Sequence, residues 1–300
     1  MSLLPSDIAL FFASSSGSGR ENNDKSNKIR EKILIDSFND KTTCFHDDPD
    51  YGAKWMEVKT SFASAVTSLG GEGQIKVIAR GGRKFNYDFE VQRDDATHKV
   101  EFKFGGTSVS NLPEFFNPAA NKSFHSTFYA DDFYDNHLPA IASLYGLALP
   151  PKDEYMKEIY KNSSKHAFFK ALREAEETQP DLYPVKAKLV RASISAFLEK
   201  VKDNTNLELL TSEFMRSQSG KRFMLWDSGR FHHDHISDTE LTAKNVVGVR
   251  NGNLLVIQSA EPGTTHEMLL RWKNHLGILF PAWQISMKRS KLADSSESHS

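Results

Sequence analysis

The chain has 300 residues, a formal net charge of −1 and one cysteine, Cys44. The length accommodates one large domain or two modest ones. A single cysteine excludes an intramolecular disulfide and a four-cysteine zinc site. Because the net charge is close to zero, a nucleic-acid partner would need a local basic patch.

Residues 1–26 begin with a short apolar stretch and continue as a linker rich in serine, glycine and asparagine. No basic residues precede the apolar stretch, so we expect a small helix and not a signal peptide. No apolar run in the sequence is long enough to span a membrane. Together with the single cysteine, these features predict an intracellular protein of the cytoplasm or nucleus with no membrane partner.

Two helices are expected next, over residues 27–38 and 53–69. In the first, Glu31 shares a face with apolar residues three, four and seven positions later. A carboxylate on a core-facing stripe is unusual, which makes Glu31 a candidate functional residue. In the second helix, Glu57 lies with serines on the polar side, so we prefer Glu31. The alternative is a boundary glutamate paired with Arg30 or a nearby lysine.

Residues 74–79 predict a strand, which a turn at Gly81–Gly82 connects to a second strand over residues 85–92. Three cations flank this turn: Arg80, Arg83 and Lys84. They are candidate contacts to nucleic-acid phosphates. The alternative is a solvated turn rich in cations.

The stretch 87–105 predicts two strands joined by a polar turn. Because strand side chains alternate between faces, one face is apolar and carries Phe89, Val91, Val100, Phe102 and Phe104. The other face carries Asp88, Glu90, Glu101 and Lys103.

A four-residue loop over residues 94–97 would set Glu90 opposite Glu101 and Asp88 opposite Lys103. Directly opposed like charges destabilise a sheet. A bound divalent cation would offset them, and carboxylate oxygens suit Mg²⁺ and Mn²⁺.

The pattern Asp88 … Glu101-Phe102-Lys103 resembles the D…(D/E)xK signature of the PD-(D/E)xK nuclease superfamily, whose fold is restriction-endonuclease-like. The resemblance covers about residues 27–130. One departure is that Tyr87, not proline, precedes Asp88.

The resemblance implies that Asp88 and Glu101 hold the metal and that Lys103 positions the attacking water and steadies charge on the scissile phosphate. Glu90 is a rival for the first acid, and the backbone carbonyl of Phe102 is a further ligand. The resemblance also gives Glu31 a place near the metal as a fourth residue.

Residues 139–217 predict mostly helices, and residues 218–288 predict strands with a type I′ turn at Asn251–Gly252. The predicted fold class is therefore α/β (α+β), a restriction-endonuclease-like mixed sheet flanked by helices, with a helical insertion and a β-rich C-terminal portion. The predicted parts are an N-terminal segment and linker (1–26), a nuclease core (27–138), a helical region (139–217), a β-rich C-terminal region (218–288) and a disordered tail (289–300).

The segment His232–His235 contains residue types that bind metals. Adjacent side chains converge on one ion only in a bent loop, so the sequence leaves this site open.

The expected function is that of a metal-dependent endonuclease which hydrolyses DNA phosphodiester bonds with Mg²⁺, for which Mn²⁺ can substitute. One alternative is a catalytically inactive nucleic-acid-binding module of the same fold. Another is a protein-interaction or effector protein. The sequence leaves open the choice between DNA and RNA, the sequence preference, and whether the chain forms a homodimer.

Overall fold

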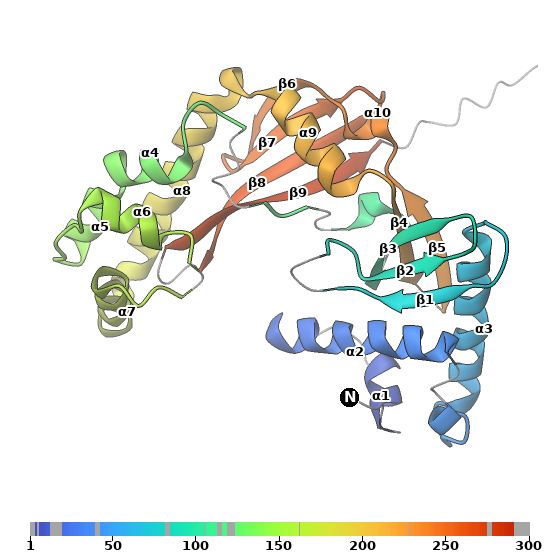
Figure 1. Ribbon diagram of the computed structural model, residues 1–300. Coiled ribbons are helices and arrows are strands. Elements are labelled where there is room, and N and C mark those ends of the chain that lie inside the picture. The colour runs from blue at the N-terminus through green and yellow to red at the C-terminus, as the bar shows by residue number, and fades with distance from the viewer. Residues whose placement is uncertain are drawn as a thin grey trace, which may run out of the picture. The chain divides into compact units, whose positions relative to one another are not determined.

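The computed structural model (Figure 1) describes residues 4, 6–12, 20–39, 43–81, 85–104, 106–112, 116–118, 124–161, 163–227, 229–274 and 278–290. The chain divides into two compact units, each made of two segments. The first contains residues 1–111 and 218–236, and the second contains residues 112–217 and 237–300. None of the helices in these described stretches is long and apolar enough to cross a membrane.

The helices of the first unit are α1 (Asp7–Phe12), α2 (Arg20–Phe38) and α3 (Gly52–Ser68), with short 3-10 turns η1 (Thr43–Phe45) and η2 (Val109–Asn111). The expected helix at 53–69 is confirmed by α3. Helix α2 includes residues 20–26, which were expected to be linker. These residues lack glycine and proline and include arginine, glutamate and lysine, so nothing in them ends a helix.

The first unit has a five-stranded mixed sheet in the order β1-β2-β3-β4-β5. Its strands are β1 (Lys76–Ala79), β2 (Phe89–Gln92), β3 (Thr97–Phe104), β4 (Lys221–Asp227) and β5 (Arg230–His235). Neighbours are antiparallel except β3 and β4, which are parallel. Residues 218–236 were expected in the β-rich C-terminal region, but they belong to this sheet because β4 pairs with β3.

Helices α1 to α3 share a hydrophobic core with one face of this sheet. The expected apolar face of the hairpin is confirmed, since Phe89, Val91, Val100 and Phe102 are buried in this core. From the helices, the core receives Leu34, Trp55 and Phe62 among others. The polar residues that alternate with the apolar ones therefore face away from it.

The register of β2 with β3 differs from the expected one. Glu90 lies opposite Lys99, and the loop is residues 93–96, closed by a hydrogen bond from Arg93 N to Ala96 O at 2.8 Å. The loop is fixed from outside, because Asp95 accepts a hydrogen bond from Glu72 N at 2.9 Å and Arg93 donates one to Thr67 O at 3.0 Å. The register is shifted by two residues relative to the expected one, and because this number is even, each side chain keeps its expected face of the sheet.

The second unit has a four-stranded antiparallel sheet in the order β6-β7-β8-β9. The strands are β6 (Ala243–Arg250), β7 (Leu254–Ser259), β8 (Thr264–Asn274) and β9 (Leu279–Arg289). Asn251 and Gly252 have φ of 53° and 68°, which confirms the expected turn. The end of β9 at Arg289 lies inside the expected tail, of which residues 291–300 lie outside the described residues.

The helices of the second unit are α4 (Tyr129–Asn136), α5 (Leu138–Leu144), α6 (Lys152–Glu158), α7 (Ala167–Thr178), α8 (Tyr183–Val201), α9 (Leu207–Gln218) and α10 (Asp238–Leu241), with η3 (Pro180–Leu182) and η4 (Lys202–Asn204). Residues 112–138 were expected in the nuclease core. They belong to the second unit because Tyr129 and Phe133 of α4 pack on Trp272 of β8, with ring centroids 5.5 and 4.9 Å apart.

Candidate functional site

Asp88 is held against the middle of β3 by two hydrogen bonds to the backbone of that strand, one from its own amide and one to its carboxylate. Its amide donates to Val100 O at 3.0 Å, and its Oδ2 accepts from Phe102 N at 2.8 Å. These bonds set Asp88 beside Glu101, and not beside Lys103 as the expected register had it. The second bond also fixes the direction of the Asp88 carboxylate.

Glu101 lies between two lysines. Lys103 Nζ is 2.6 Å from Oε1, and Lys221 Nζ is 3.3 Å from Oε2. Glu101 and Lys103 are two residues apart on β3 and therefore share a face. Lys221 is the first residue of β4, which the parallel pairing brings beside β3. Lys221 could not be assigned to this cluster from the sequence, because no local pattern says which strand β4 joins.

The charges of Asp88, Glu101 and Lys103 shift the pKa of Glu31 on α2. Burial, followed by the negative charges of Asp88 and Glu101, raises the pKa of Glu31 to about 8, although Lys103 opposes the shift. Glu57, the alternative helix acid, lines a surface hollow of about 650 Å³ beside Phe231 and His233. The choice of Glu31 over Glu57 stays a prediction.

The pKa values of the cluster depart from their ordinary values in different directions. Burial and the neighbouring Glu101 raise the pKa of Asp88 to about 6. Burial also acts to raise the pKa of Glu101, but Lys103 and Lys221 outweigh it, and the net direction is down. The pKa of Lys103 is raised, because Glu101 and Asp88 outweigh its burial. Such divergent shifts among neighbouring groups are typical of functional sites.

Glu90 has a separate set of partners. Its carboxylate accepts hydrogen bonds from Tyr87 Oη at 2.5 Å, from Arg80 Nη2 at 2.9 Å and from Gln92 Nε2 at 3.1 Å. Hydrogen bonds from Arg80 and Tyr87 lower its pKa. Glu90 therefore lies in an ion pair with Arg80, which was expected to contact phosphate. Arg83 and Lys84 lie outside the described residues.

The donor set at Asp88 and Glu101 fits a hard divalent cation. Within the described residues, no group of three or more His, Cys, Asp or Glu side chains forms a metal-binding arrangement. Mg²⁺, however, is commonly held by only one or two carboxylates together with waters and substrate phosphates. Burial, and after it the repulsion between neighbouring carboxylates, raises the pKa of Asp88 and Glu31, and a cation would relieve the repulsion.

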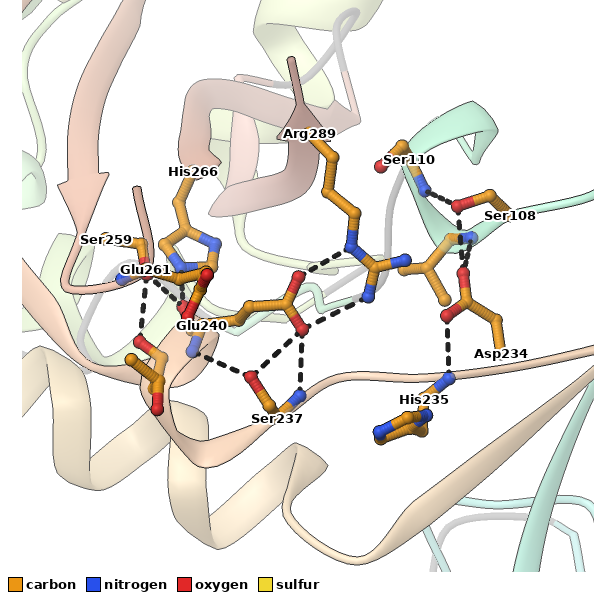
Figure 2. A network of polar contacts seen from close by, with 12 residues as sticks. Ser108, Ser110, Asp234, His235, Ser237, Glu240, Ser259, Glu261, His266 and Arg289 are labelled. Carbon is orange, nitrogen blue, oxygen red and sulfur yellow. Dashed lines mark hydrogen bonds and ion pairs between the residues drawn. The ribbon is translucent and has the colours of Figure 1, made fainter. Parts of the chain in front are cut away.

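The segment His232–His235 lies in β5, so adjacent side chains point to opposite faces. Asp234 accepts hydrogen bonds from Ser108 Oγ and Val109 N, both at 2.8 Å (Figure 2). His233 Nε2 is 3.1 Å from Ser68 Oγ. These residues tie η2 and α3 to the edge of the first sheet, which is a structural role.

Figure 2 also shows a polar cluster of the second unit around Glu240. Ser237 and Glu240 form the capping box of α10, and Glu240 is paired with Arg289 of β9 at 2.5 Å. His266 Nε2 lies 2.7 Å from Glu240 O, and Ser259 Oγ donates to the same carbonyl at 2.9 Å. The cluster fastens α10 to the second sheet.

Comparison with protein-family models, with curated proteins and with solved structures gave no match.

Proposed function

We propose that the chain is a metal-dependent nuclease that hydrolyses phosphodiester bonds in DNA, and that its first unit has a restriction-endonuclease-like fold. The observation that carries the proposal is the placement of Asp88, Glu101 and Lys103 on the polar side of one hairpin. Asp88 Oδ2 accepts a hydrogen bond from Phe102 N at 2.8 Å, Lys103 Nζ is 2.6 Å from Glu101 Oε1, and the charges of all three residues shift the pKa of Glu31 on α2. These are the residues that the nuclease signature requires.

The topology of the first unit supports the proposal. Helices α1 to α3 precede three antiparallel strands, and the sheet becomes mixed where β4 joins β3 in parallel. The signature residues lie on β3 and just before β2, and helices cover the opposite face.

Asp88 and Glu101 would hold the metal, and the carbonyl of Phe102 is a further candidate ligand. A bound Mg²⁺ supplies two things in such a site: it lowers the pKa of a bound water and offsets charge on the phosphoryl oxygens. Glu101 is the member of the set whose pKa is lowered, so it is ionised at neutral pH, as a metal ligand must be.

We assign to Lys103 the direct contact with the attacking water and the phosphate. Its ammonium is 2.6 Å from Glu101, and its side chain is 36% exposed, so it can reach both a water and a phosphate oxygen. In the reaction, the water oxygen forms a bond to phosphorus and loses a proton, the P–O bond to the leaving group breaks, and the leaving oxygen gains a proton. Lys103 would orient the water and stabilise the added negative charge.

Glu31 is mostly protonated at pH 7 in the metal-free protein, because its pKa is about 8. A cation nearby would favour its ionised form. Glu31 would therefore release a proton when the metal binds and add a third negative charge to the site.

The test is cleavage of plasmid and single-stranded DNA with Mg²⁺, with Mn²⁺ and with EDTA. Wild-type protein should cut only with metal, and Glu101→Ala and Lys103→Ala should each lower the rate at least about 100-fold. Lys99→Ala is the matched control, since Lys99 is an exposed lysine on the same face of β3, opposite Glu90. It should leave the rate unchanged.

Retained cleavage in Glu101→Ala or Lys103→Ala would show that the assignment is wrong. DNA binding without cutting by the wild type would favour an inactive binding module. Neither cutting nor salt-dependent binding would favour a protein-interaction role.

A further inference from the structure

Lys221 is a second lysine at the proposed metal ligand Glu101. Its Nζ is 3.3 Å from Glu101 Oε2, while Lys103 Nζ is 2.6 Å from Oε1. Each oxygen of this carboxylate therefore has one ammonium group as a partner. Each oxygen keeps a second lone pair, but a cation that binds Glu101 must compete with two ammonium groups for the same carboxylate.

The two lysines differ in burial. The side chain of Lys221 is 5% exposed, against 36% for Lys103. Lysine is rarely buried unless it is paired, because taking its charge out of water is costly. A buried ammonium cannot follow a substrate or an attacking water. Lys221 therefore suits a fixed electrostatic role and Lys103 a role in the chemistry.

The two contacts also differ in strength. The contact of Lys103 with Glu101 has the length of a strong charge-assisted hydrogen bond, and the contact of Lys221 is longer than that range. Glu101 Oε2, which faces Lys221, is therefore the oxygen that a metal can coordinate more easily. Lys103 can keep its partner while this happens.

We propose that Lys221 is a positioning residue which holds Glu101 in the metal-free protein and sets the metal concentration at which the site fills. This inference rests on the proposed function, because it takes Glu101 as a metal ligand. Without metal, Lys103 and Lys221 together balance the carboxylates. With metal, the buried charge of Lys221 stays close and repels the cation, so the site binds the metal more weakly than its carboxylates alone would.

The test is Mn²⁺ binding to the full chain without nucleic acid, measured by titration calorimetry and by the electron paramagnetic resonance of free Mn²⁺. Lys221→Met keeps most of the side-chain volume and removes the charge, and it should tighten Mn²⁺ binding at least about tenfold. Lys221→Arg keeps the charge and should stay within about threefold of the wild type. Arg222→Met is the matched control, because Arg222 is the next residue on β4 and is exposed. It should not change the affinity.

A double-mutant cycle shows whether the effect passes through Glu101. In a Glu101→Gln background, Lys221→Met should change Mn²⁺ affinity much less than it does in the wild type. Circular dichroism would show that each variant is folded. If Lys221→Met is unstable, the Lys221→Gln variant serves the same comparison.

The outcomes separate this inference from the proposed function. If the wild type binds Mn²⁺ and cuts DNA, but folded Lys221→Met binds Mn²⁺ no more tightly, the role given to Lys221 is wrong and the nuclease stands. If the wild type neither binds Mn²⁺ nor cuts, the proposed function fails and the inference fails with it. Tighter binding in both Lys221→Met and Arg222→Met would also overturn it, because general surface charge would then explain the change.

Discussion

Glu31 is a residue of the first unit whose pKa is strongly raised by the fold. Its pKa of about 8 lies far above that of an ordinary glutamate, because of burial and of the negative charges of Asp88 and Glu101. The folded state therefore binds this proton more tightly than the unfolded state does. The consequence is that Glu31 lowers the free energy of unfolding as pH rises from about 4.5 to about 8.

Glu31→Gln should remove this pH dependence. Near pH 5 the variant and the wild type should be about equally stable, because glutamine resembles protonated glutamate. At pH 9 the metal-free variant should be more stable, by about 1–3 kcal/mol once solvent screening is allowed for. Urea unfolding of both proteins in EDTA at several pH values measures the difference.

Glu57→Gln is the matched control for this experiment, because Glu57 is an exposed helical glutamate of the same unit. It should show no such difference between pH 5 and pH 9. An equal effect of Glu31→Gln at every pH would mean that the carboxyl is not perturbed as described. Added Mg²⁺ should reduce the wild-type pH dependence, since a cation offsets the repulsion.

At the scale of an element, the turn between β6 and β7 depends on backbone conformation. Asn251 and Gly252 both have positive φ, at 53° and 68°. Side chains with a Cβ are disfavoured in this region, and asparagine and glycine tolerate it best. A Cβ at Gly252 would also lie 3.2 Å from the hydroxyl oxygen of Ser195 on α8.

Gly252→Ala should therefore lower the free energy of unfolding of the second unit by about 1–2 kcal/mol. Asn251→Gly is the comparison, since glycine accepts the same φ, and its effect should be only a few tenths of a kcal/mol. Chemical denaturation followed by tryptophan fluorescence measures both. Equal stability of Gly252→Ala and the wild type would show that the turn relaxes without strain.

At the scale of the whole molecule, the two units are interleaved along the chain but each has its own sheet. In the second unit, Lys186 of α8 and Glu176 of α7 form a buried ion pair, with both side chains 2% exposed. Burial lowers the pKa of Lys186 and raises the pKa of Glu176, so each charge depends on the other. Removing one partner leaves the other charge buried and uncompensated.

Lys186→Met should destabilise the second unit by about 3–5 kcal/mol, and the double variant Lys186→Met/Glu176→Leu should recover most of this loss. Because each unit buries a core of its own, calorimetry should show two transitions. Lys186→Met should lower one of them, and Mg²⁺ should raise the other through binding to the first unit. If both changes act on one shared transition, the two units unfold as a single cooperative body.

Local sequence pattern alone was enough to predict several features of both units. The alternation in residues 87–104 placed Asp88, Glu101 and Lys103 on the polar side of a hairpin whose other face is buried. It could do so because side-chain direction in a strand is set by the backbone and repeats every two residues. The turn at Asn251–Gly252 was predictable for a similar reason, since few residues accept its dihedral angles.

Tertiary structure decided the features that depend on contacts between distant parts of the chain, which are the β2–β3 register and the partners of Glu101. The β2–β3 register follows from contacts of the loop with Thr67 and Glu72, which a hairpin pattern does not contain. Glu101 acquires Lys221 only because β4, more than 100 residues later, joins β3 in parallel. Sequence thus determined the face on which each chemical group lies, through local backbone geometry. Packing between remote segments determined which groups lie close together. These neighbours set the net charge of the candidate site and the pKa of each of its residues.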